Sequence, residues 1–156
     1  MWVCRAGRGE KDIELFLENN KIYLAWEGYD VNLSSIKDFQ QIKELVISEK
    51  HPEARTSLSN WSTQINVFIN LMEKGDYVLL PYPKSRYYAL AKITGDYTFE
   101  PNFKYHHSRR IKILKRGVPR EAFAQNIRYS LGAFRTVFNT KYDDEILKVV
   151  NEWNGE

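Results

Sequence analysis

The residues best suited to bind a ligand are the cations of residues 104–120, KYHHSRRIKILKRGVPR. This stretch holds seven Lys or Arg and two His in seventeen residues, and it contains no acidic residue. Clustered cations bind nucleic acid, because binding releases the counterions that the phosphates otherwise condense. Apolar residues are interleaved with the cations, which predicts a folded strand rather than a disordered tail. The stretch favours a nucleic-acid partner; the alternative is a solvated strand face on which Lys and Arg stems cover apolar surface.

The sequence lacks the residue patterns of several common enzymes that act on nucleic acids. It has no Gly-rich phosphate loop followed by Lys and Ser or Thr. One Cys and three His do not supply a tetrahedral zinc site, and the adjacent His106 and His107 would face opposite sides of a strand. No Asp or Glu stands two residues before any Lys, the pairing of magnesium-dependent restriction nucleases. We therefore expect a non-catalytic domain with no metal and no other cofactor.

A small metal-independent ribonuclease is the enzymatic alternative. Lys, Arg, Tyr and His side chains alone can stabilise a phosphorane-like transition state. The candidate residues lie in the first part of the basic stretch and are Tyr105, His106 or His107, and Arg109. Product formation would distinguish this alternative from a binding domain.

Length and composition indicate one domain with its own core. The chain has 156 residues, of which 43% are hydrophobic, and its formal net charge is only +3, so its basic character is local. We expect a single domain over residues 1–153 and a polar linker or chain end at 154–156. The single cysteine, Cys4, excludes an internal disulfide and favours a reducing compartment. Without a signal peptide or an apolar run of membrane-spanning length, the protein is expected to be soluble and cytoplasmic.

Hydrophobic periodicity predicts strands interrupted by helices in the first half of the chain and a strand meander after residue 76. The predicted strands cover residues 1–5, 21–26, 77–80, 87–93, 111–114 and 134–138, with turns at 81–85 and 94–95. The predicted helices cover residues 10–19, 34–50, 57–74, 121–130 and 143–153. This pattern is typical of an α+β fold with a curved sheet or a small open barrel.

Five landmarks, taken in order, resemble the PUA-like superfamily and in particular its EVE and YTH-like branch. They are MWVCRAG at residue 1, GDYVLLP at 75, YYALAKITGDY at 87, HHSRRI at 106 and SLGAFRTVF at 130. Their order and spacing carry the resemblance, which extends from Met1 to about Phe138. The chain is most similar to the version fused in front of Mrr- or McrB-type modification-dependent restriction enzymes.

The resemblance implies a small barrel flanked by helices that reads nucleic acid without cutting it. Members of this branch hold one extruded nucleotide in an aromatic pocket, so the implied ligand is modified duplex DNA with a flipped methylated cytosine or adenine. Four Trp and ten Tyr supply rings for such a pocket. Stacking returns about 1–3 kcal/mol per base against the few kcal/mol that flipping costs. The implied role is the specificity domain of a restriction or defence enzyme, working with a nuclease.

The matching positions assign residues to the base pocket. Trp26 stands at the end of the second predicted strand, and Trp61 stands near the start of the helix that precedes the Gly-Asp strand. Asn60 and Gln64 lie one helical turn apart and could read a base edge. The chain lacks a clear third cage Trp, for which Tyr82 or Tyr97 could substitute. The predicted contacts with the nucleic-acid backbone are Arg5, Lys84, Arg86, His107, Arg109 and Arg110.

Three alternatives stay open at this point. Trp61 falls on the apolar stripe of its predicted helix, so ordinary core packing would also explain it. Asn60 and Gln64 could be solvent-facing helix residues. An RNA-binding PUA-like module without a nuclease partner is the functional alternative to a reader of modified DNA.

Overall fold

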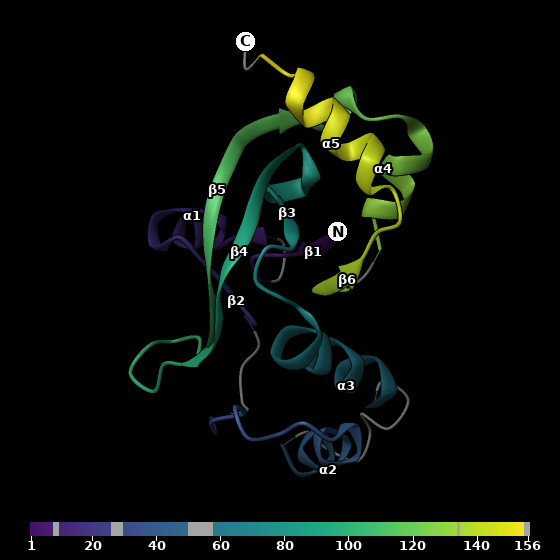
Figure 1. Ribbon diagram of the computed structural model, residues 1–156. Helices are drawn as coiled ribbons and strands as arrows, with labels where there is room; N and C mark the ends of the chain where they lie inside the picture. The colour runs from purple at the N-terminus through teal and green to yellow at the C-terminus, as the bar shows by residue number, and fades with distance from the viewer. Residues whose placement is uncertain (8–9, 26–29, 50–57, 134, 155–156) are drawn as a thin grey trace.

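The strands form one mixed sheet, which confirms the predicted α+β fold with a curved sheet (Figure 1). The computed structural model describes residues 1–7, 10–25, 30–49, 58–133 and 135–154. Within them the strand order is β2-β5-β4-β3-β1-β6; β1 and β3 are parallel, and the other neighbours are antiparallel. The strands are β1 (Trp2–Cys4), β2 (Lys21–Tyr23), β3 (Tyr77–Pro81), β4 (Tyr87–Phe99), β5 (His107–Pro119) and β6 (Val137–Asn139).

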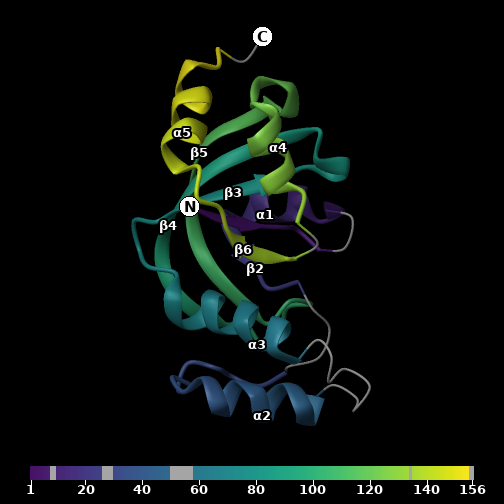
Figure 2. The same ribbon diagram turned by 90° about the vertical axis from the view of Figure 1, so that its right-hand side faces the viewer.

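Helices lie at both ends of the sheet. In both views α4 and α5 lie at one end, and α2 and α3 lie at the other (Figures 1 and 2). None of the helices in the described residues is long and apolar enough to span a membrane. The helices are α1 (Ile13–Asn19), α2 (Phe39–Glu49), α3 (Leu58–Asn66), the π-helix η3 (Val67–Leu71), the 3-10 turns η4 (Pro83–Ser85) and η5 (Arg120–Ala122), α4 (Gln125–Leu131) and α5 (Asp143–Glu152).

The long hairpin of β4 and β5 corrects one prediction. A turn was expected at Thr94–Gly95, but β4 continues through both residues to Phe99. Gly95 serves the close approach of two strands instead, because a Cβ at this position would lie 2.9 Å from the Cβ of Arg110. The pairing of β4 with β5 changes register between Ile93 and Tyr97, the segment that contains Gly95. The glycine therefore marks an irregular place inside the hairpin and not its end.

Successive residues of the central strands point to opposite faces of the sheet and pack into two apolar clusters, one on each face. Val78 and Ala91 are directly paired and join the cluster that contains residues of α1, α2 and α3. Leu79 and Leu90 are also paired and join the cluster that contains residues of α4 and α5. This is the period of two that a strand dictates. We name the two sides the α3 face and the α5 face.

Cys4 is fully buried on the α3 face, and burial raises the pKa of its thiol to about 12. Near pH 8 its thiolate fraction is then roughly a thousandfold below that of a thiol at the ordinary value of 9.0. We expect iodoacetamide to leave Cys4 of the native protein unmodified while it alkylates the denatured chain completely. Equal alkylation rates for the two states would contradict this burial.

Candidate nucleic-acid interface

The strand β5 distributes the basic stretch over both faces of the sheet. On β5, Lys112 lies directly opposite Lys92 of β4, which in turn lies opposite Tyr77 of β3. Arg110, two residues before Lys112, lies opposite Lys21 of β2. Directly opposed residues share a face, and Tyr77 and Lys92 alternate with the residues of the α3 face. These four cations therefore all belong to the α5 face.

The four cations differ in whether they have a partner. Lys21 forms an ion pair with Glu100 at 3.0 Å, and the Lys92 ammonium lies 5.1 Å from the centre of an aromatic ring. The side chains of Arg110 and Lys112 are exposed, and neither has a hydrogen-bond or ion-pair partner in the described part of the chain. The helices α4 and α5 cover this face only toward the other end of β5 (Figure 1). We call Arg110 and Lys112 the sheet cations.

A second group of cations lies near the C-terminal end of β5. Lys84 and Arg86 belong to the turn between β3 and β4, which Tyr82 begins. Burial raises the pKa of Tyr82. Arg116 stands two residues before Val118, which is paired with Tyr88 just after this turn. Lys84, Arg86 and Arg116 are exposed and, among the described residues, form no hydrogen bond or ion pair through their side chains. We call these three the turn cations.

Arg109 is buried on the α3 face, so the prediction that it contacts phosphate is wrong. Only 3% of the residue is exposed. Its guanidinium donates to the carbonyl oxygens of Phe68 at 3.3 Å and Met72 at 2.7 Å, and twice to that of Gly95, at 3.0 and 3.2 Å. Burial lowers the pKa of Arg109, and nearby carboxylates oppose the shift. Arg109 thus ties the end of η3 to β4 and has no surface role.

The predicted phosphate contact of His107 is also wrong, because only 2% of this residue is exposed. Its Nδ1 lies 2.6 Å from the hydroxyl oxygen of Tyr97, and the two rings stack with their centroids 5.7 Å apart. The Tyr97 hydroxyl also accepts a hydrogen bond from the backbone N–H of Leu33 at 3.1 Å. Burial raises the pKa of Tyr97 to about 12. His107 and Tyr97 therefore anchor the segment that precedes α2.

Arg5 is an internal residue and not the phosphate contact that was predicted. Its guanidinium forms an ion pair with Glu10, whose side chain is 6% exposed, and lies 3.4 Å from the Ser85 hydroxyl. The same group donates to the carbonyl oxygens of Leu131 at 2.9 Å and Ala133 at 3.2 Å. Arg5 joins three segments that are far apart in the sequence, and its donors are not directed to solvent.

The structure only partly assembles the predicted base pocket. Trp26 lies outside the described residues. Trp61 in α3 is partly buried and packs against the core, and the nearby Asn60 has a buried Oδ1 that finds no hydrogen-bond partner among the described residues. Gln64 cannot offer its carbonyl oxygen to a base edge, because it is buried and accepts the backbone N–H groups of residues 136 and 137 at 2.8 and 2.9 Å. Tyr82 follows β3 at the α4 end of the sheet, away from α3 (Figure 1).

The side chains considered for a ribonuclease are also buried or make contacts within the fold. The Tyr105 hydroxyl donates to Asp12, and Tyr105 is 8% exposed. His106 faces Asp30 at 3.5 Å, while His107 and Arg109 are buried as described. Within the described residues, no three side chains of His, Cys, Asp and Glu lie together as ligands for a metal ion.

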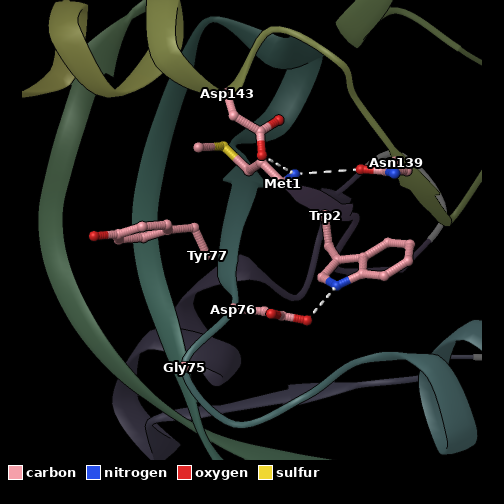
Figure 3. Close-up of a pocket in the computed structure, with 7 residues that line it drawn as sticks. All are labelled: Met1, Trp2, Gly75, Asp76, Tyr77, Asn139 and Asp143. Carbon is pink, nitrogen blue, oxygen red and sulfur yellow. Dashed lines mark hydrogen bonds and ion pairs between the residues drawn. The ribbon is translucent and has the colours of Figure 1, made fainter.

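A pocket of about 290 Å³ lies where β1 begins (Figure 3). Its residues are Met1, Trp2, Gly75, Asp76, Tyr77, Asn139 and Asp143. The Asp76 carboxylate accepts the Trp2 indole N–H at 2.9 Å, and the Asp143 carboxylate binds the amino group of Met1 at 2.6 Å. A second pocket of about 350 Å³ adjoins it along β6 and shares Trp2 and Asn139. The two carboxylates make the first pocket a poor site for a phosphate.

Lys112 and Arg116 were not among the contacts predicted from the sequence. The signal for Lys112 was present, because a residue two positions from Arg110 on a strand shares its face. The register of the β4–β5 pairing shifts before Arg116, so the alternation of strand residues does not predict which face of the sheet its side chain occupies.

Comparison with known proteins gives a family and no function. The family model of a domain of unknown function, DUF8426, matches residues 2–140. The chain therefore belongs to the DUF8426 family. No curated protein and no solved structure gives a match to this chain.

Proposed function

We propose that this chain is a non-catalytic nucleic-acid recognition domain of the cytoplasm, with modified duplex DNA as its ligand. Phosphates bind along the outside of the β4–β5 hairpin, and a flipped methylated cytosine or adenine supplies the specificity. The PUA-like resemblance of the sequence landmarks supports the modified base and a partnership with a nuclease. The single observation that supports nucleic acid is the set of unpartnered cations on and beside β5.

The concentration of unpaired cations along one hairpin supports this proposal. Lys21, Lys74 and Lys104 each have a carboxylate within 3.3 Å. The sheet cations and turn cations have none in the described part of the chain, although they lie along one hairpin. Clustered cations without carboxylate partners repel one another and lower the stability of the fold, and a bound polyanion relieves that repulsion.

The spacing of the two groups suits a chain of phosphates. Arg110 and Arg116 are separated by six residues of β5, which corresponds to roughly 20 Å along a strand. That length spans several consecutive nucleotides of a single backbone. The sheet cations belong to the α5 face, whereas Tyr82 beside the turn cations packs against the cluster of the α3 face, so the two groups contact a bound nucleic acid from the two ends of β5.

Replacing both sheet cations, Arg110→Ala with Lys112→Ala, should weaken binding to every duplex at least about tenfold at low salt. The slope of log K against log salt should become shallower by about 1.8, because each lost phosphate contact removes about 0.9. Fluorescence anisotropy with labelled duplexes over a salt series measures both quantities. The double variant Lys37→Ala with Lys74→Ala removes the same charge from exposed positions near α2 and η3 and should change neither.

Four matched ligands test the specificity: unmodified DNA, DNA with one methylcytosine, DNA with one methyladenine, and RNA of the same sequence. Preference for one modified duplex supports the proposal. Preference for RNA would replace it with an RNA-binding module, and cleavage of any ligand would replace it with an enzyme. An unchanged salt slope in the Arg110/Lys112 double variant would show that the hairpin is only a solvated face.

A further inference from the structure

The turn between β3 and β4 has an unusual backbone. Lys84 has φ +60° and Ser85 has φ +50°, and both are residues with a Cβ in the left-handed region. Glycine is the residue that adopts this region without strain. Two successive strained residues persist only where the surrounding structure holds them, and such places concentrate at ligand-binding sites.

A buried polar network holds this turn. The Ser85 hydroxyl donates to Oε1 of Glu10 at 3.1 Å, and the same carboxylate forms an ion pair with Arg5. Glu10 is itself left-handed, with φ +55°, and is only 5% exposed. The described chain has four left-handed residues with a Cβ, and three of them lie together at this turn. They are Glu10, Lys84 and Ser85, and Arg5 lies beside them. The fold thus concentrates its backbone strain beneath this turn.

The turn presents an aromatic ring and the turn cations to solvent. Tyr87, at the start of β4, is 47% exposed. Its ring packs edge-on against that of Tyr82, with centroids 6.1 Å apart and planes at 68°. The Tyr82 N–H donates to the Tyr87 carbonyl oxygen at 2.9 Å, so the two tyrosines close the turn. Lys84 and Arg86 lie between them in the sequence, and Arg116 stands three residues before Pro119, which is paired with Tyr87.

We propose that this turn is a nucleotide-binding site in which an unstacked base lies on the Tyr87 ring while Lys84, Arg86 and Arg116 hold the adjacent phosphates. This inference rests on the proposed binding of nucleic acid and adds a base contact to the phosphate contacts of the hairpin. An exposed ring accepts any base through its face, because every base has a π-face. The Arg5–Glu10–Ser85 network positions the site and does not itself contact the ligand.

The test compares Tyr87→Ala with Tyr129→Ala, an equivalent change at a tyrosine of α4 that is 71% exposed. Tyr87→Ala should weaken binding of a labelled oligonucleotide with one unpaired nucleotide by about 5- to 150-fold, the range of one lost base stack. Tyr87→Phe should restore native affinity, because stacking needs the ring and not the hydroxyl. Tyr129→Ala should bind as the native protein does. The salt slope should stay unchanged in all three variants, since none removes a phosphate contact.

Lys84→Gly provides an independent measurement on the strained backbone. Glycine relieves the positive φ, so the melting temperature should rise, while affinity falls with the loss of a cation and of a rigid turn. The variant should also have a shallower salt slope. A rise in melting temperature with native affinity and slope would show that the strain serves the fold alone.

The possible outcomes separate this inference from the proposed function. If Tyr87→Ala keeps native affinity while the Arg110/Lys112 double variant binds weakly, the turn site is refuted and the nucleic-acid interface stands. If Tyr87→Ala and Tyr129→Ala weaken binding equally, the effect is not specific to the turn and the inference is again refuted. If the native protein binds none of the oligonucleotides, both proposals fail.

Discussion

Replacing Arg109 with alanine is expected to destabilise the protein by about 3–5 kcal/mol, because several buried carbonyl oxygens lose their charged donor. The guanidinium serves the carbonyl oxygens of Phe68, Met72 and Gly95, and alanine would leave them without this donor in a buried place. Each buried group left without a partner costs about 1–3 kcal/mol. Urea unfolding followed by tryptophan fluorescence measures the difference.

The neighbouring Arg110 provides the matched control for this experiment. It has the same side chain in the same strand but is exposed, so Arg110→Ala should change stability by no more than about 0.5 kcal/mol. Arg109→Lys should recover only part of the loss, because an ammonium lacks the planar fork that reaches η3 and β4 together. Equal stabilities of Arg109→Ala and Arg110→Ala would contradict the internal role of Arg109.

Replacing Glu10 with alanine is the second change with a large expected effect, about 3 kcal/mol. The substitution leaves the largely buried guanidinium of Arg5 without its carboxylate and removes the acceptor of the Ser85 hydroxyl. Breaking one partner of a buried ion pair costs about 3–5 kcal/mol, and the two carbonyl oxygens that still bind Arg5 place this case at the lower limit. The loss should show as a lower urea midpoint.

Two further variants identify the source of that loss. Glu18→Ala removes an exposed carboxylate from α1 and should leave stability within about 0.5 kcal/mol of the native value. Arg5→Met combined with Glu10→Ala should cost less than the sum of the two single changes, because no charge is left unpaired. Additive losses would mean that Arg5 and Glu10 act separately.

The fold was largely predictable from local patterns. Residues 77–80 and 87–93 alternate or form short apolar runs between turn residues, and strands formed at both places. The prediction of a turn at Thr94–Gly95 was wrong, because the glycine is needed for a close contact with the partner strand. Glycine is favoured both in turns and where two backbones approach closely, and only the position of Arg110 shows which applies.

The site was less predictable, because charge alone does not tell which side of a strand a residue occupies. Arg109 and Arg110 look equivalent in the sequence, yet one is buried and the other is exposed. A usable signal was present: Ile111 and Ile113 share the parity of Arg109, so their apolar side chains indicate that residue 109 faces inward. Gln64, beside the buried Ile65, is a similar case of a polar residue that satisfies buried backbone donors.

The position of Arg109 next to Arg110 has a consequence for ligand binding. One residue carries the tie between η3 and β4, and the next carries an unpartnered cation on the opposite face. A ligand that binds Arg110 on the α5 face therefore contacts the residue next to the one that holds the end of η3 to β4 on the α3 face.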